Sequence, residues 1–149
     1  MCGIAGFISP NLSENSLKET ITMMISKLEH RGPDGNGRYE NNHLSMGHTR
    51  LRIIDDNKRS DQPMISKCGR YIIIFNGEIY NYKNLRDILI QKKINLTTYG
   101  DTEAILEGYN LFGTKVLDYL NGMFAFAIWD NVKKKFFCAR DRIGIKPFY

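Results

Sequence analysis

Cys2 is the residue whose type and position offer the most direct chemistry in this sequence. A small residue after the initiator methionine normally allows Met1 to be removed, which leaves the cysteine at the start of the mature chain. Its thiol and its free α-amino group then belong to one residue, and in short peptides such groups have pKa values of about 8.5 and about 8. The amine can take the proton of the thiol, directly or through water, so one residue supplies both nucleophile and base.

Two other interpretations of Cys2 stay open. A cysteine at the second position is often only a small apolar residue that enters a strand. A retained Met1 would also leave no free cysteine amine, and therefore no base. Whether Cys2 can act as a nucleophile depends on the structural elements and sequence motifs that surround it.

The composition excludes several classes of protein. The 149 residues carry 21 Lys and Arg against 16 Asp and Glu, for a formal net charge of +5, and 42% are hydrophobic. This apolar content is too high for a disordered chain, and the longest apolar run, 123–129, is far shorter than the roughly 20 residues that cross a bilayer. Three cysteines without a CxxC pair and no visible signal peptide indicate a cytoplasmic protein with reduced thiols and no membrane partner.

The positive charge gathers near the end of the sequence, above all at Lys133, Lys134 and Lys135. A basic run of this kind suits either a nucleic-acid-binding surface or a solvated hairpin tip. We expect the hairpin tip and no nucleic-acid partner, because no aromatic stacking platform or known nucleic-acid motif accompanies the run.

Apolar spacing predicts the elements that must position Cys2. Strands are expected at 3–8, 46–54, 71–75, 123–129 and 135–139, the last two as a hairpin. Helices are expected over 17–28, with Ser16 and Glu19 as a capping box, around 85–89, and at 101–112. Residues 31–37 are rich in turn formers and are expected to form a loop. Since several neighbouring strands lack a crossover helix, we predict an α+β fold with antiparallel sheets covered by helices.

Six short motifs occur in order along the chain: CGIAGF at 2–7, HRGPD at 30–34, FNGEIYN at 75–81, GDTE at 100–103, LNGMFAF at 120–126 and RDRIGIKPFY at 140–149. Each is weak evidence alone. Together they resemble the glutaminase domain of class II glutamine amidotransferases, and specifically that of glutamine-hydrolysing asparagine synthetases.

The resemblance implies a fold and a reaction. The fold would be the four-layer αββα sandwich of N-terminal nucleophile hydrolases. The reaction would be the hydrolysis of glutamine to glutamate and ammonia, with Cys2 as the catalytic nucleophile. In the resembled enzymes the ammonia travels to a synthetase domain, where ATP activates aspartate for asparagine synthesis.

Asn76 and Gly77 would provide the oxyanion site, by the same resemblance. The Asn76 side-chain amide and the Gly77 backbone N–H would hold the charged oxygen of the tetrahedral intermediate. A second interpretation is local, because Asn-Gly between apolar residues is typical of a hairpin turn. Both interpretations can hold if a turn beside the site aims its donors inward.

The resemblance also implies how glutamine is bound. A guanidinium can hold a carboxylate through two parallel hydrogen bonds, so Arg50 would clamp the α-carboxylate. Asp101 and the region of Glu78 would hold the α-ammonium, and the backbone around Leu51, Ile53 and Ile54 would line the pocket. The alternatives are a surface charge on a strand for Arg50 and an N-cap of a helix beginning at Thr102 for Asp101.

No metal or cofactor site is expected within this chain. His30, His43 and His48 with Cys68 and Cys138 match no ligand spacing, and the sequence has no P-loop or Rossmann glycine motif. ATP and magnesium are therefore expected only in a synthetase domain outside this sequence.

Residues 1–149 are expected to form a glutaminase domain that is incomplete at its C-terminus, since the resembled domain continues past Tyr149, and no synthetase domain is expected within this sequence. The expected partners are glutamine, a synthetase domain in cis and a second copy in a homodimer. Two alternatives for the function stay open. The chain could be the glutaminase domain of an amidotransferase that amidates another carboxylate, or a non-catalytic module that binds glutamine.

Overall fold

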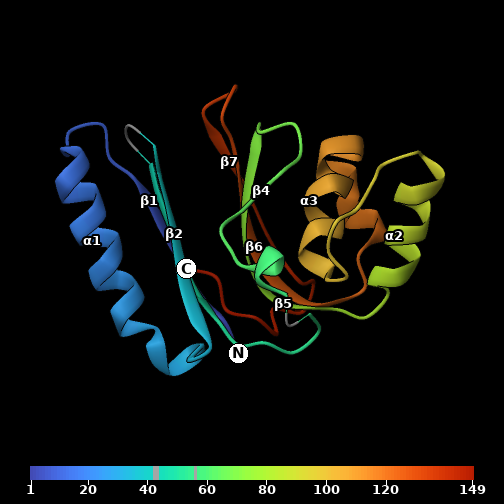
Figure 1. The fold of residues 1–149 in the computed structure, drawn as a ribbon, viewed down its shortest axis with the longest axis horizontal. Helices are drawn as coiled ribbons and strands as arrows, with labels where there is room; N and C mark the ends of the chain where they lie inside the picture. Colours follow the sequence, from blue (N-terminus) through green and yellow to red (C-terminus); the bar gives the residue numbers. More distant parts are fainter. Residues whose placement is uncertain (42–43, 56) are drawn as a thin grey trace.

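The computed structural model describes residues 1–41, 44–55 and 57–149. Two antiparallel sheets lie between helix α1 (Glu14–Lys27) on one side and helices α3 (Asp101–Phe112) and α2 (Tyr82–Gln91) on the other (Figure 1). The predicted α+β class with antiparallel sheets is confirmed. Among the described residues, no helix is long and apolar enough to span a membrane.

The first sheet has the strand order β1-β3-β2. Its strands are β1 (Gly3–Ile8), β2 (Gly35–Asn41) and the central β3 (Leu44–Arg50), which is buried along its whole length. The prediction that residues 35–37 form a loop is wrong, because they pair with β3. The strand predicted to reach residue 54 instead ends at Arg50, whose partner Gly35 is the first residue of β2 and leaves nothing for a longer β3 to pair with.

Helix α1 covers the outer face of this sheet. Its stripe of Leu17, Ile21 and Ile25 is buried as predicted, and a Cβ atom on Gly47 of β3 would lie 2.6 Å from Ile25. The glycine therefore lets the helix approach the strand closely. The predicted capping box is wrong: the N-cap is Ser13, whose hydroxyl accepts a hydrogen bond from the Ser16 N–H at 3.2 Å. Ser16 itself lies inside the first turn.

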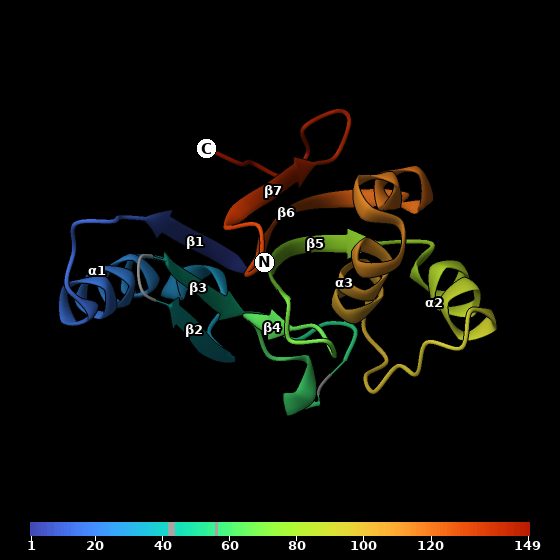
Figure 2. The same ribbon diagram turned by 90° about the horizontal axis from the view of Figure 1, so that it is seen from above.

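The second sheet has the order β4-β5-β6-β7 (Figure 2). Its strands are β4 (Met64–Ile65), β5 (Tyr71–Ile79), β6 (Gly122–Asp130) and β7 (Lys135–Arg140). The predicted hairpin of β6 and β7 is confirmed, with the exposed lysines at its tip. The predicted turn at Asn76-Gly77 is wrong, because both residues lie within β5 and pair with β6.

Two apolar clusters hold the layers together. One lies between β5, β6 and helices α2 and α3, around Ile73, Phe75 and Ile105. The other lies between the two sheets and includes Met46 of β3 and Ile74 of β5. Since side chains alternate between the faces of a strand, even-numbered residues of β5 face the first sheet and odd-numbered ones face the helices.

His48 is a buried histidine on the same face of β3 as Leu44 and Met46. Neither of its ring nitrogens has a hydrogen-bond partner in the described part of the chain. Because a charged imidazolium is costly to bury, burial lowers the pKa of His48 to about 4 from its usual 6.5. The folded chain therefore holds this histidine neutral at neutral pH.

We expect the free energy of unfolding to fall as the pH drops from 6.5 towards 4, since only the unfolded chain takes up a proton at His48 in that range. At about 1.4 kcal/mol per pKa unit, the loss from this residue is about 3 kcal/mol. Urea denaturation of a His48→Leu variant should lack this loss. A His30→Leu variant, altered at an exposed histidine, should retain it. Equal acid sensitivity in His48→Leu and the wild type would contradict the assignment.

Candidate functional site

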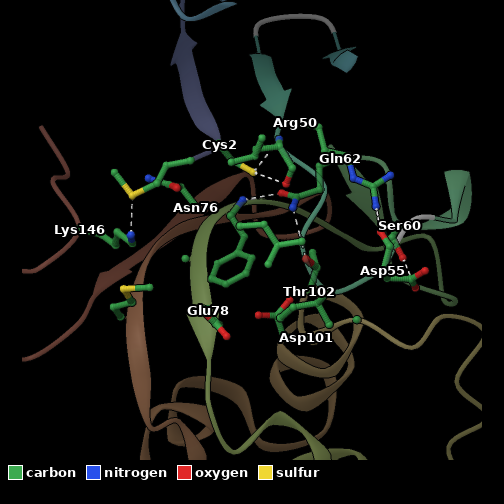
Figure 3. A pocket seen from close by; sticks show the side chains of 18 residues that line it. Cys2, Arg50, Asp55, Ser60, Gln62, Asn76, Glu78, Asp101, Thr102 and Lys146 are labelled. Atoms are coloured by element: carbon green, nitrogen blue, oxygen red, sulfur yellow. Dashed lines mark hydrogen bonds between the residues drawn. The ribbon is translucent and has the colours of Figure 1, made fainter. Parts of the chain in front are cut away.

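A pocket of about 130 Å³ opens where the start of β1, the end of β3, the middle of β5 and the start of α3 meet (Figure 3). All nine residues that the sequence assigned to the site line it: Cys2, Arg50, Leu51, Ile53, Ile54, Asn76, Gly77, Glu78 and Asp101. Segments far apart in the sequence are thus brought together. The roles of these residues in binding and catalysis stay predictions.

The thiol of Cys2 is held at the edge of the first sheet. Its sulfur accepts a hydrogen bond from the Leu51 N–H at 3.4 Å and lies 3.7 Å from the Leu51 carbonyl oxygen, to which it can donate. The next residue is anchored too, since the Gly3 N–H donates to the Thr49 hydroxyl at 3.0 Å. The sulfur therefore has a defined position in a half-buried side chain that remains accessible from the pocket.

Asn76 and Gly77 lie at the centre of β5. The side chain of Asn76 is buried on the same face of β5 as those of Ile72 and Ile74, so it points towards the first sheet. Cys2, which directly precedes β1 of that sheet, lines the same pocket (Figure 3). A Cβ atom on Gly77 would lie 2.3 Å from the carbonyl oxygen of Met123. Glycine is required here because β5 and β6 approach too closely for any side chain.

Asp101 is the first residue of α3, and Gly100 is the N-cap, so the predicted N-cap role of Asp101 is wrong. Its carboxylate instead reaches across to β5, where it accepts a hydrogen bond from the Ile79 N–H at 3.1 Å. Burial raises the pKa of Asp101 to about 6, and the nearby charge of Glu78 adds to the increase. A negative charge at this end of the pocket is therefore present at neutral pH and lost below about 6.

Arg50 is buried, so the interpretation as an exposed strand charge is wrong. Its guanidinium donates to the carbonyl oxygens of Asp55 and Asn57, the latter at 3.1 Å, and to the carboxylate of Asp61. These bonds hold the side chain on the side of the pocket where Asp55 lies (Figure 3). Arg50 therefore holds Asp55, Asn57 and Asp61 in place in addition to lining the pocket.

The segment after β3 forms one wall of the pocket. Leu51 and Ile54 are partly buried, whereas Ile53 is 69% exposed at the mouth. The Asp34 carboxylate holds this segment by accepting a hydrogen bond from the Arg52 N–H at 2.8 Å. Asp34 thus helps to hold the backbone of this wall in place.

Sequence reasoning missed several lining residues, among them Met1, Asp55, Ser60, Gln62, Thr102, Met123 and Lys146. The buried Lys146 places its ammonium 2.7 Å from the Met1 sulfur. Gln62 is buried among polar partners from β5 and α3. Lys146 lies within one of the motifs, but no pattern of spacing singled it out, and Gln62 lies in none of them.

A second, larger cavity of about 710 Å³ is lined by residues of β1, the end of α1, strands β5 to β7 and the C-terminal segment. Its lining is mostly apolar and includes Ile4, Ile74 and Phe136. Cys2 and Asn76 line both cavities, so these two residues form part of the wall between them.

No group of three or more His, Cys, Asp or Glu side chains in residues 1–41, 44–55 and 57–149 could hold a metal ion. His43, which the sequence analysis considered as a ligand, lies outside these described residues. The described pocket brings together the Cys2 thiol, the Asn76 side-chain amide, the Asp101 carboxylate and the Arg50 guanidinium.

Comparison with known proteins adds an independent finding. Residues 1–149 match the family described as "Glutamine amidotransferase domain". The whole chain is 37% identical to the glutamine-hydrolysing asparagine synthetase 3 of Bacillus subtilis strain 168 and 39% identical to a putative asparagine synthetase 2 of Methanocaldococcus jannaschii. It is also 34% identical to a Gibberella zeae protein named amidase chry2. These matches cover 24%, 32% and 24% of the relatives, so the chain spans a quarter to a third of their lengths.

Proposed function

Because the chain belongs to the glutamine amidotransferase domain family, we propose that it hydrolyses glutamine to glutamate and ammonia, with Cys2 as the nucleophile. The observation that carries this proposal is the single pocket shared by the Cys2 thiol, the Asn76 amide and the Asp101 carboxylate. A thiol beside amide donors suits acyl transfer, and a carboxylate suits a substrate ammonium. The test is the equimolar release of glutamate and ammonia from glutamine by the mature chain.

The proposed reaction begins once Met1 is removed. The Cys2 α-amine takes the thiol proton, and the sulfur attacks the carboxamide carbon of glutamine. The Asn76 amide and the Gly77 N–H stabilise the resulting oxyanion. The C–N bond then breaks, and ammonia leaves with the proton that the amine returns, while a thioester remains on Cys2. A water molecule activated by the same amine hydrolyses the thioester to glutamate and restores the thiol.

The other lining residues would recognise the amino-acid end of glutamine. Arg50 holds the α-carboxylate, since a guanidinium has more N–H donors than its three acceptors on Asp55, Asn57 and Asp61 use. Asp101, with Glu78 nearby, holds the α-ammonium. The backbone at 51–54, which includes Leu51, Ile53 and Ile54, closes the remaining wall.

We expect glutamine binding to weaken below about pH 6, because Asp101 then loses the charge that pairs with the α-ammonium. Calorimetry on a Cys2→Ala variant separates binding from chemistry. Its Kd for glutamine should rise about tenfold for each pH unit below 6, since each proton taken up by the free pocket competes with the ligand.

A Cys2→Ala/Asp101→Asn double variant provides the comparison. At pH 7.5 it should bind glutamine about 10–100-fold more weakly, which corresponds to the loss of a charge-assisted hydrogen bond. Its Kd should then stay nearly constant between pH 5 and pH 7.5, values chosen to bracket the pKa of about 6. A double variant that binds as tightly as Cys2→Ala would remove Asp101 from the proposed binding site.

The arrangement of layers supports a finer assignment of the fold. Helix α1, the two sheets and the pair α3 and α2 follow one another in the order αββα (Figure 1). We propose that this is the sandwich of N-terminal nucleophile hydrolases, in which the first residue of the chain begins a strand beside the active site. The position of Cys2 directly before β1 agrees with that architecture.

The function of the whole protein is a wider proposal. The chain would supply ammonia to a synthetase domain in cis, which would use ATP and magnesium to make asparagine from aspartate. Two relatives carry asparagine synthetase names over lengths well beyond this chain. We further propose a cytoplasmic location, where the unpaired Cys2, Cys68 and Cys138 stay reduced. Assembly as a homodimer stays a prediction.

Two alternatives remain distinct. The first is that the acceptor of ammonia is a different carboxylate, and one of the relatives carries the name of an amidase. A non-catalytic glutamine-binding module would instead follow from a retained Met1. An intact-chain mass that still includes Met1, together with glutamine binding but no glutamate release, would favour the second alternative.

A further inference from the structure

Side chains rather than a strand cover one edge of β5 near the pocket. β4 pairs with β5 only at Ile72 and Ile73, whereas β5 continues to Ile79. Phe75, Gly77 and Ile79 alternate along the strand, so their backbone N–H groups point to the same edge. The Phe75 N–H donates to Gln62 Oε1 at 2.6 Å, and the Ile79 N–H donates to Asp101 Oδ2 at 3.1 Å.

Gly77 lies between these two satisfied donors. In the described part of the chain no side chain accepts a hydrogen bond from its N–H in the way that Gln62 and Asp101 do for its neighbours, and Gly77 lines the pocket. The Gly77 N–H is thus a backbone donor that the edge of β5 offers to the pocket, and the Phe75 and Ile79 N–H groups on either side of it already donate to Gln62 and Asp101. The direction of the Gly77 N–H depends on how β5 is held at Phe75 and Ile79.

Gln62 is fixed from several sides. It is buried, its Nε2 donates to the Thr102 hydroxyl at 3.3 Å, and its Oε1 accepts from Phe75. Its main chain is also packed tightly, because a Cβ atom on Gly37 of β2 would lie 2.1 Å from the Gln62 carbonyl oxygen. One amide group therefore links β5 just before Asn76 to α3 just after Asp101.

We infer that Gln62 is a positioning residue for the reaction: it holds β5 so that the Asn76 amide and the Gly77 N–H face the substrate carbonyl at a fixed distance from Asp101. This inference rests on the proposed function. The carboxamide of Gln62 satisfies the Phe75 N–H through its oxygen and donates to the Thr102 hydroxyl through its nitrogen. Its removal leaves a buried N–H without a partner and releases the strand beside the oxyanion site.

The two bonds of Gln62 have separable consequences. A Gln62→Met variant has a similar side-chain size but loses both bonds, so kcat should fall about 10–100-fold as the oxyanion donors lose their alignment. A Thr102→Val variant keeps the hydrogen bond between Gln62 and the Phe75 N–H, and it loses only the hydrogen bond between Gln62 and the start of α3. Its KM for glutamine should rise several-fold, while kcat stays within about threefold of the wild type. A Gln91→Met variant, altered at an exposed residue of α2, should leave both constants unchanged.

Amide hydrogen exchange on the same mature chains gives a readout that does not depend on activity. Gln62→Met should accelerate exchange at residues 75–79, with residues 71–73 less affected because they lie beside β4 and Ser66. Unchanged exchange at residues 75–79 would overturn the inference. Faster exchange at these residues with an unchanged kcat would also overturn it, because Gln62 would then have only a structural role. A Thr102→Val variant with the same loss of kcat would also overturn it. If the wild type releases no glutamate, the proposed function fails and the catalytic role of Gln62 fails with it, whereas exchange still tests the link between β5 and α3.

Discussion

A Cys2→Ala variant should lose glutamine hydrolysis by a factor of about 10⁴ or more, because the side chain that forms the thioester is removed. The loss should appear in kcat, since the variant keeps the Asn76, Gly77 and Asp101 groups and still binds glutamine. The measurement is release of glutamate from glutamine, followed by the mass of the intact chain after treatment with a glutamine-like electrophile. The wild type should gain one label at Cys2, and the variant should gain none.

Cys68 provides the matched control for this experiment. It is an exposed, unpaired cysteine that lies outside both cavities, and its sulfur lies 3.3 Å from the Ser66 hydroxyl. A Cys68→Ala variant should hydrolyse glutamine at the wild-type rate and still take the label. Cys2→Ala protein that releases glutamate at more than about one-hundredth of the wild-type rate would reject Cys2 as the nucleophile.

A chain whose N-terminus is extended beyond Cys2 should bind glutamine but hydrolyse it about 10²–10⁴-fold more slowly, because the α-amine that serves as base becomes an amide. Met1 is half exposed, so an extension at this point can leave the pocket towards solvent. The extension is built with a protease site that, once cleaved, leaves Cys2 as the first residue. Glutamate release is measured on the same preparation before and after cleavage.

Cleavage should restore full activity together with the mass of the mature chain. Alkylation by iodoacetamide checks the thiol separately, since this small electrophile needs no amide-binding groups. The extended chain should therefore still be alkylated at Cys2. Equal rates of glutamate release before and after cleavage would show that the free amine is not needed, and another group would have to act as the base.

The local sequence pattern predicted most of the helices and strands, but its prediction of a turn at Asn76-Gly77 was wrong. The dipeptide is typical of a hairpin turn, yet it lies in the middle of β5, because the apolar residues on both sides are covered by the first sheet and by the helices. Tertiary packing determined the local conformation here. The close approach of Met123 explains the glycine, and this contact joins residues 46 positions apart, beyond the reach of any local rule.

The motifs predicted part of the site, and the structure showed the rest. Cys2, Asn76, Gly77, Glu78 and Asp101 lie within three of the motifs, and these three motifs meet in one pocket, whereas Arg50, Leu51, Ile53 and Ile54 line the same pocket but lie in no motif. The motifs did not reveal that Arg50 is bonded to Asp61 or that Gln62 links β5 to α3. Such links depend on side-chain directions across the fold, and a buried glutamine has no periodicity that sets it apart from an exposed one.

The wall shared by the two cavities has a practical consequence for inhibitor design. Cys2 and Asn76 are accessible from the larger, mostly apolar cavity as well as from the smaller pocket. An apolar compound bound in the larger cavity would contact both residues, although it would not resemble an amino acid. The selectivity of such a compound would depend on residues such as Phe136 that the smaller pocket does not include.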